Sequence, residues 1–458
     1  MKTSTVNKND IFGASLRFDP SFHLSEGVKV RSQLHKSPYG LSIVGDSASD
    51  VFYGNIFSRV FVKKPDHGVP YLAASETVLS DINTGRYLSK KQANQLSYLM
   101  LKKDWILVTC SGTLGNVTYT NKIFENHIAT HDLIRIIPND RKVNKGTLYA
   151  FLSGKYGYYQ ITQSQFGGVV KHINESHMRS IIVPNFPESF QKEVDDLIQQ
   201  SAKLREQASA KLDEAKNIFE NVIGVSNTDY GAYKNEGIAI QSIAGKFKRM
   251  DSQYQIGHKS IVKEKRNLTT TKINDVAKDI FTGNRGKRNY VENDGIYFLS
   301  SSEMMLANPK RFCKKISRRT PNLNDLLVKK GNILISRSGS VGNTILVSDD
   351  LNGCAVSEHA MRLVIDEEKI APEYVFAYFC TKQGKDSLAI LPYGSVIVTL
   401  GEEFLGDVDL PLLPIETQDR ITALVKEYSK MTDMAIEKEN KAITMVEEEI
   451  EKWQSPTA

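Results

Sequence analysis

ILVTCSGTLGNVTYT, residues 106–120, has a close counterpart farther along the chain in ILISRSGSVGNTILV, residues 333–347. Gly112 matches Gly339 and Gly115 matches Gly342, each at an offset of 227 residues. An internal period of this length predicts a duplicated domain, because the units of solenoid repeats span only tens of residues. The same offset joins further identical residues: Glu76 with Glu303, Lys102 with Lys329, Lys103 with Lys330, Arg135 with Arg362, Gly157 with Gly384, Gly167 with Gly394, Pro184 with Pro411, Pro187 with Pro414 and Gln191 with Gln418.

The offset rises slightly toward the beginning of the two copies, which indicates small insertions. DVFYGN (residues 50–55) matches DIFTGN (residues 279–284) at an offset of 229, and Arg17 and Asp19 match Arg249 and Asp251 at 232. A chain of 458 residues suggests about two to four domains. The repeat divides it into four parts: a first domain (1–186), a first long helix (187–223), a second domain (224–413) and a second long helix (414–458).

Composition places the chain among globular proteins, with 40% hydrophobic and 24% charged residues and no apolar run long enough to cross a bilayer. The beginning of the sequence lacks the apolar stretch of a signal peptide, and the four cysteines have no metal-type spacing. We therefore expect a cytoplasmic protein with reduced thiols and no bound zinc. The net charge of +6 favours a polyanionic partner without deciding it.

Each copy shows the same succession of short apolar runs and longer mixed segments. The short runs are bounded by Gly, Asn and Asp and predict strands, whereas the longer segments predict helices that cover a sheet. The sequence thus predicts an α/β (α+β) fold for each copy. The strand segments are 106–109, 133–137, 333–336 and 361–365, and the helical segments are 147–159 and 373–384.

A proline pair and a long helix close each copy, at residues 188–222 and 415–453. Apolar residues in both helices follow alternating steps of four and three, the pattern of a coiled-coil seam. We predict that the two helices pack together, antiparallel, as a spacer in a pseudo-twofold arrangement. The alternative is that each packs on its own domain as an ordinary amphipathic helix. The seam residues expected to be buried between the helices are Leu197, Leu204, Leu424 and Met431.

A two-headed arrangement matches a DNA duplex, which presents two half-sites related by an approximate dyad. In these features the chain resembles the specificity subunits of type I restriction-modification systems, and the resemblance covers nearly its whole length. It rests on ILISRSGSVGN and its less similar counterpart ILVTCSGTLGN, on the DIF-x-GN segments and on PLLPIETQDR (residues 411–420). The first copy departs from the last motif with PNFPESFQKE, residues 184–193, which keeps the prolines and Gln191.

The resemblance implies a non-catalytic subunit that reads a bipartite DNA site with one domain per half. It also implies two adenine methyltransferase subunits and motor-nuclease subunits as partners, in a system of DNA methylation and restriction. The sequence contains no glycine-rich cofactor loop after a strand, no methyltransferase tetrapeptide and no P-loop lysine. We therefore expect no cofactor, no metal and no catalytic residue in this chain.

Three other functions stay open at the level of sequence. The chain could serve a type II system whose partner fuses nuclease and methyltransferase, and only the neighbouring subunits would discriminate that case. It could itself be a methyltransferase or nuclease with unusual motifs, which binding of a methyl donor to the isolated chain would reveal. It could also be a scaffold whose functional part is the coiled coil, in which case the assembled complex would not bind DNA.

Basic residues around the turn glycine Gly283 and in the run KRFCKKISRR, residues 310–319, are candidates for DNA contacts. Arginine at a matched loop position can reach guanine in the major groove, and a basic strip with an aromatic residue suits phosphates. The alternatives are surface salt bridges for the loop and a solvated surface for the run. The candidates are Arg59, which matches Arg288, together with Arg285, Lys287, Arg288, Arg311, Lys314 and Lys315.

The repeated glycine loop offers further candidate donors in Arg337, Ser338 and Ser340, beside glycines that let the backbone approach a phosphate. A loop shared by both copies cannot distinguish two different half-sites. It is therefore expected to fix the fold or to hold the DNA backbone, and base-reading residues should lie where the copies differ. Lys171 is a further candidate near Gly167, where the second copy has Val398.

Overall fold

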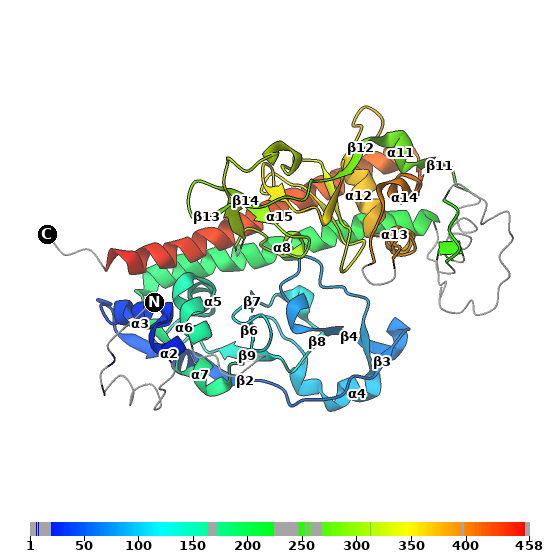
Figure 1. Cartoon of the computed structure of the whole chain (residues 1–458). Helices are drawn as coiled ribbons and strands as arrows, with labels where there is room; N and C mark the ends of the chain where they lie inside the picture. Colours follow the sequence, from blue (N-terminus) through cyan, green and yellow to red (C-terminus); the bar gives the residue numbers. More distant parts are fainter. Residues whose placement is uncertain are drawn as a thin grey trace. The chain divides into compact units, whose positions relative to one another are not determined.

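The computed structural model (Figure 1) describes residues 20–163, 172–223, 247–251, 268–311, 313–394 and 398–453, together with residues 6, 8, 254, 255 and 257. The candidate Lys171 lies outside the described residues. The chain divides into two compact units. Unit 1 comprises Met1–Glu206 and Met434–Ala458, and unit 2 comprises Gln207–Asp433.

The described residues of unit 1 form two four-stranded sheets and a two-stranded one. Sheet A is antiparallel in the order β2-β9-β6-β7, and sheet B has the order β3-β5-β4-β8, with β4 and β8 parallel. Strand β1 (Leu41–Ile43) pairs with β10 (Ile182–Pro184). The strands of sheet A are β2 (Ala48–Phe52), β9 (Leu133–Pro138), β6 (Ile106–Thr109) and β7 (Val117–Tyr119); those of sheet B are β3 (Phe61–Val62), β5 (Tyr87–Ser89), β4 (Gly68–Leu72) and β8 (Ile128–Ala129).

Unit 2 repeats the three sheets with the same strand order. Sheet A is β12-β19-β16-β17, sheet B is β13-β15-β14-β18, and β11 (Thr270–Lys272) pairs with β20 (Asp409–Pro411). A shift in the strand-pairing register also recurs in the first strand of sheet A. It lies between Ala48 and Asp50 in β2 and between Ala277 and Asp279 in β12. The duplicated fold is therefore confirmed. The strands are β12 (Ala277–Thr282), β19 (Ala360–Ile365), β16 (Ile333–Ser336), β17 (Thr344–Leu346), β13 (Tyr290–Val291), β15 (Lys314–Ile316), β14 (Ile296–Leu299) and β18 (Ala355–Val356).

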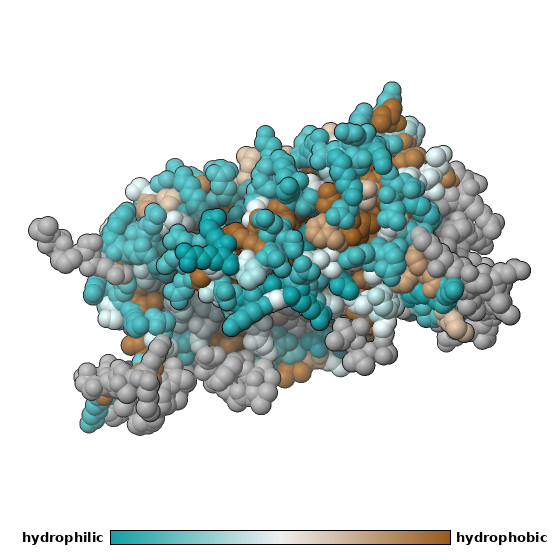
Figure 2. Space-filling model, turned by 45° about the horizontal axis from the view of Figure 1, so that its top comes forward, coloured by the Kyte–Doolittle hydropathy of each residue, from teal (hydrophilic) through white to brown (hydrophobic). Residues whose placement is uncertain are grey.

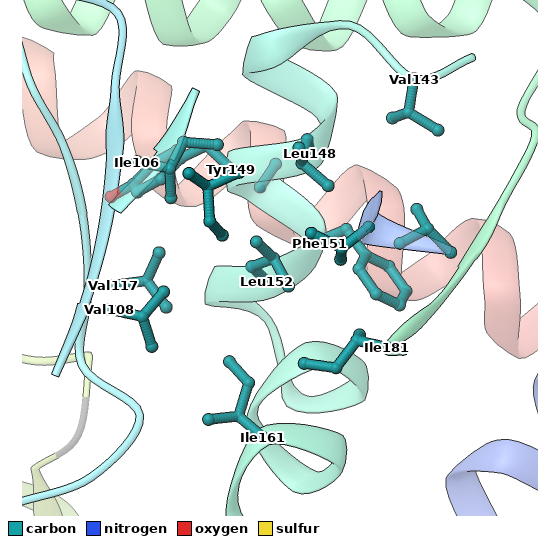
Figure 3. Close-up of a cluster of buried hydrophobic side chains, with 14 of the residues drawn as sticks. Ile106, Val108, Val117, Val143, Leu148, Tyr149, Phe151, Leu152, Ile161 and Ile181 are labelled. Carbon is teal, nitrogen blue, oxygen red and sulfur yellow. The ribbon is translucent and has the colours of Figure 1, made fainter. Parts of the chain in front are cut away.

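Helices cover sheet A in each unit. In unit 1, Leu148, Phe151 and Leu152 of α5 (Lys145–Ser153) belong to the same buried cluster as Ile106 and Val108 of β6 (Figure 3). Such contacts remove apolar surface from water, at about 25 cal/mol for each Å² buried. Unit 2 has its own core, in which residues of α12 (Pro372–Cys380) pack with those of β16 and β19.

Each helical segment expected from the sequence is in fact a pair of short helices. Helix α5 is followed by α6 (Lys155–Gln163), and α12 by α13 (Lys382–Ala389). A Cβ at Gly157 would lie 2.4 Å from Leu152 Cα, and one at Gly384 would lie 2.0 Å from Tyr378 O. The matched glycines are therefore required because the second helix of each pair folds back tightly against the first.

The two long helices are α8 (Glu188–Ile223) and α15 (Ile415–Lys452). Their starts are fixed by matched glutamines, each of which binds back to the chain that enters the helix. Gln191 Nε2 donates to Phe186 O and Gln418 Nε2 donates to Leu413 O, both at 2.8 Å. These bonds use carbonyl groups just ahead of each helix, which explains why the glutamine is kept even where the first copy's entry motif departs.

Within each unit the two long helices run antiparallel. In unit 1, Ser201 Oγ donates to Ala435 O at 2.7 Å, while Phe186, at the entry to α8, has its ring 6.0 Å from that of Trp453, just past the end of α15. Helix α8 thus begins in the unit of its own repeat, and the final part of α15 joins it there.

In unit 2 the arrangement is the reverse, because the last part of α8 packs with the first part of α15. Lys211 pairs with Glu427 at 2.7 Å and Glu214 with Arg420 at 2.8 Å. Farther along α8, Phe219 is fully buried in the core of unit 2. Each long helix therefore starts on the domain of its own repeat and ends in the core of the other unit.

Burial of the four seam residues follows the expectation only in part. Leu197 and Leu424 are buried, at 9% and 7% exposure, whereas Leu204 and Met431 are half-buried near the boundaries between the units. Leu197 and Leu424 also share their core clusters with residues of the sheets and covering helices. The helices pair as expected, but their seams are completed by the domains and are not those of an isolated coiled coil.

Candidate functional site

The repeated glycine loop closes the β6–β7 hairpin of unit 1 and the β16–β17 hairpin of unit 2. Its glycines have positive φ in both units, +72° and +81° for Gly112 and Gly115 and +76° and +91° for Gly339 and Gly342. Residues with a Cβ rarely adopt this left-handed conformation, so the spacing of the two glycines follows from the shape of the turn.

A hydroxyl group at the end of the preceding strand braces the loop from inside. In unit 2, Ser336 Oγ donates to Ser340 O and accepts from Asn343 N at 3.0 Å. In unit 1 the equivalent Thr109 Oγ1 donates to the carbonyl oxygen of Thr113 at 2.6 Å and accepts from Asn116 N at 3.0 Å. The carbonyl group of the candidate Ser340 is thus used in a hydrogen bond that stabilises the loop.

The other loop candidates of unit 2 contact neighbouring segments. Arg337 Nε donates to Leu400 O at 3.1 Å, and its Nη1 donates to Thr282 Oγ1 at 3.4 Å. Ser338 Oγ lies 2.7 Å from His359 Nδ1. These contacts tie the loop to the end of β12 and to the turn before β19, which is a supporting role for Arg337 and Ser338.

Arg59 and Arg288, matched in the sequence, are held in similar ways in the two units. Arg59 Nε donates to Tyr71 Oη at 2.6 Å and its side chain is 34% exposed. Arg288 lies over the ring of Phe298, 5.5 Å from its centroid, and donates to Asn284 O at 2.7 Å. Its side chain is only 10% exposed, so it reaches solvent much less than Arg59 does.

Arg285 and Lys287 occupy the exposed part of the loop between β12 and β13. The Arg285 side chain is 79% exposed, and its Nε lies 3.7 Å from Glu358 Oε1. Since an ion pair this exposed contributes little to stability, the guanidinium can leave it at small cost. Among the sequence-predicted arginines of this loop, Arg285 is the more accessible.

The basic run of residues 310–319 does not form one face. Lys314 and Lys315 are consecutive residues of β15, and successive side chains of a strand point to opposite sides of the sheet. Lys314 is exposed and lies over Tyr290, at 5.2 Å, whereas Lys315 is half-buried and lies over Tyr297, at 5.1 Å. Arg311 is also half-buried, in the turn before β15. Lys314 and Lys315 therefore lie on opposite sides of the sheet, and a phosphate-contacting role for the run stays a prediction.

A buried arginine joins sheet A to sheet B in each unit. Arg135 Nη2 donates to Ala129 O at 2.9 Å, and Arg362 Nη2 donates to Leu326 O at 2.9 Å and Val356 O at 3.2 Å. Burial lowers the pKa of each guanidinium to about 10. Arg135 Nη1 also donates to Leu133 O at 3.0 Å, so Arg135 holds both ends of the turn that precedes β9, whereas Arg362 holds the start of the turn that precedes β19.

That turn contains polar residues that the sequence analysis did not single out: His131 and Asp132 in unit 1, Glu358 and His359 in unit 2. In both units a carboxylate of this turn faces the matched arginine, since Arg59 Nη2 lies 3.9 Å from Asp132 Oδ2 and Arg288 Nη2 lies 3.6 Å from Glu358 Oε2. The sequence could have indicated these residues. At the offset of 227, His131-Asp132 aligns with Glu358-His359, so the histidine and the carboxylate are in opposite order in the two copies.

Nothing in the described parts of the chain forms a metal site of three or more His, Cys, Asp or Glu side chains. In the same residues, no helix is both long and apolar enough to span a bilayer. On the face drawn in Figure 2, hydrophilic residues predominate and hydrophobic residues occur in separate patches.

A family model described as "Type I restriction modification DNA specificity domain" matches residues 49–214 and again residues 265–445. Among solved structures, a type I restriction-modification S subunit from M. genitalium has 12% identity and a TM-score of 0.35, over 92% of this chain and 97% of that chain. The HsdS subunit from Thermoanaerobacter tengcongensis has 12% identity and a TM-score of 0.28, over 91% and 96%. No curated protein sequence gives a significant match.

Proposed function

Since the chain belongs to the type I restriction-modification DNA specificity family, we propose that its two units each read one half of a bipartite site in double-stranded DNA. The chain is the specificity subunit of a restriction-modification complex and directs target recognition. It is not itself an enzyme, because the subunits of this family recognise DNA without catalysing the reaction.

The observation that carries the proposal is the repetition of one fold with different side chains on its loops. Both units have the same strand order and the same glycine-loop hairpin. The matched strands of sheet B nevertheless differ, since Lys315 of β15, which pairs with Tyr297, stands where Tyr87 of β5 pairs with Pro70. Two copies of one scaffold with different surfaces suit the two unequal halves of an asymmetric DNA site.

Within unit 2 we assign base contacts to the exposed loop between β12 and β13, through Arg285 and Lys287, with Arg288 beside them. Arg59 has the corresponding place in unit 1. Guanidinium groups can donate two hydrogen bonds to O6 and N7 of guanine in the major groove. The 79% exposure of Arg285 supports its selection for this role.

Phosphate contacts are assigned to Lys314, Lys315 and Arg311, which supply sequence-independent affinity by releasing counterions. The exposed ammonium group of Lys314 is the best placed of the three. For Arg337, Ser338 and Ser340 the internal contacts favour support of the loop over direct contact with DNA. Lys171 is retained as a candidate from the sequence alone.

The partners that follow from this function are two adenine methyltransferase subunits and the restriction subunits with motor and nuclease activity, in the cytoplasm. The four cysteines are free thiols, which suits a reducing compartment. We further propose the domain division given by the repeat, with recognition domains at residues 1–186 and 224–413. The segments 187–223 and 414–458 then serve as spacer helices.

The test is to express this chain with its modification subunits and to map which adenines become methylated. The proposal expects methylated adenines in two short specific sequences separated by a spacer of fixed length. Methylation without sequence preference, or at a single continuous site, would contradict it. Expression of the modification subunits without this chain is the control, and it should leave these adenines unmethylated.

A further inference from the structure

The turn between sheets B and A carries a histidine and a carboxylate in opposite order in the two units. Its backbone is equivalent in both, because Cys110 N donates to Asp132 O at 3.2 Å and Arg337 N donates to His359 O at 2.8 Å. Asp132 and His359 therefore occupy the same place in the fold, next to the glycine loop. By the same correspondence His131 matches Glu358, so the exchange is a feature of the structure and not an accident of alignment.

In unit 1 the carboxylate comes second in the turn. Asp132 Oδ2 accepts from Thr130 Oγ1 at 3.2 Å and lies 3.9 Å from Arg59 Nη2. His131 packs edge-on against Phe57, with ring centroids 5.8 Å apart, and its Nε2 lies 3.5 Å from Asp132 Oδ1. The Asp132 side chain is 34% exposed and the His131 side chain 16%.

In unit 2 the carboxylate comes first and faces two arginines. Glu358 Oε1 lies 3.7 Å from Arg285 Nε, and Oε2 lies 3.6 Å from Arg288 Nη2. His359 is 45% exposed, its Nδ1 lies 2.7 Å from Ser338 Oγ, and its Nε2 lies 3.9 Å from Glu358 Oε1. The Glu358 side chain is 21% exposed.

The arginine contacts of both carboxylates are longer than the 2.7–3.2 Å of ordinary N–H···O hydrogen bonds. Such pairs hold opposite charges close together but leave hydrogen-bonding capacity on the oxygens and on the guanidinium groups. Arg337 differs, because its guanidinium donates to a carbonyl and a hydroxyl of the fold. The turn therefore offers an acceptor and donors side by side, and the acceptor stands at a different position in each unit.

We propose that the pairs His131–Asp132 and Glu358–His359 are specificity-determining residues that contact base edges, one pair for each half of the DNA site. This inference rests on the proposed function and adds residues to it. A carboxylate can accept a hydrogen bond from the amino group of cytosine, while arginine and histidine can donate to guanine. Because the order of histidine and carboxylate is reversed between the units, each unit offers its hydrogen-bond acceptor and donor at different positions. One scaffold can thereby read two different half-sites.

The experiment exchanges the order in unit 2 with the double variant Glu358→His, His359→Asp, in the complete assembly with its modification subunits. Binding is selected from DNA libraries randomised in one half-site at a time. The preference at one or two positions of the second half-site should change about tenfold or more, and that of the first half-site should stay as in the wild type. The single variant Glu358→Gln should reduce the preference at the same positions.

A control variant, Glu367→Gln, removes a carboxylate from the turn at the other end of β19 and should leave both preferences unchanged. Melting temperatures identify a variant that does not fold, and in that case Glu358→Gln and Asp132→Asn, which neutralise the carboxylate of each unit's turn, carry the test. Equal loss of affinity for all sequences, unchanged preferences, or a change in the first half-site caused by a unit 2 variant would each overturn the inference. A wild-type complex that selects no sequence would instead refute the proposed function.

Discussion

Replacing Phe219 with alanine should destabilise unit 2 although the residue belongs to the helix that follows the first domain. The ring is fully buried, with its centroid 4.8 Å from that of Tyr374 and 6.0 Å from that of Tyr378. Removal of a buried phenylalanine ring costs about 3–5 kcal/mol of folding free energy. Because each 1.4 kcal/mol is about tenfold in an equilibrium constant, local opening of unit 2 should become roughly 100-fold to several thousandfold more frequent.

Hydrogen–deuterium exchange with peptide resolution measures this opening. Peptides from β16 and α12 should exchange much faster in the variant, while those from β6 and α5 should keep their protection, since they lie in unit 1. Val222→Ala, one turn farther along α8 at a side chain that is 49% exposed, is the matched control and should change stability by less than about 0.5 kcal/mol. Equal acceleration in both units, or none in unit 2, would refute the assignment of this part of α8 to unit 2.

Three further predictions concern thiols and DNA contacts. Burial raises the pKa of Cys110 to about 12 and that of Cys354 to about 11, so alkylation of both at pH 8 should be slow in the native protein and fast after unfolding, as measured by mass spectrometry. Alanine at Lys314 and Lys315 should weaken binding to all sequences alike and reduce the salt slope by about 0.9 for each lost phosphate contact, with most of the effect from the exposed Lys314; a change in sequence preference would contradict this role. Arg285→Ala should relax one position of the second half-site by about 1–3 kcal/mol in the library selection, and an equal effect on both half-sites would exclude it as a base contact.

The duplicated fold could be predicted from the sequence because one constant offset carries both the strand pattern and the turn glycines. Gly339 and Gly342 stand where the turn needs positive φ, so the motif reports backbone geometry directly. The long helices were also predictable to within about a residue, since Pro187 and Pro414 mark their starts and an apolar periodicity, broken in the first helix at Ser201 and Lys211, marks their lengths.

The candidate site was less predictable, because it depends on contacts between strands that are distant in the sequence. Nothing local indicates that Arg59 meets the hydroxyl of Tyr71, or that Arg288 lies in a largely buried place over Phe298. The basic residues of the run are nearly consecutive in the sequence, but the side chains of Lys314 and Lys315 in β15 point to opposite faces of the sheet. Apolar periodicity likewise shows which face of a helix is buried and not which domain buries it.

The sharing of the long helices between the units also sets an order in time for synthesis and folding. The core of unit 1 includes Ala442, Val446 and Ile450 of α15, which are made more than two hundred residues after the last residue of its first segment, Glu206. At about 5–20 residues per second, the first domain waits on the order of 10–50 s for the side chains that complete its core. During that interval the apolar face of α5 and the hydroxyl of Tyr149, the later partner of Glu439, lack their covering helix. The first domain of a nascent chain is thus expected to be the part that depends most on chaperones.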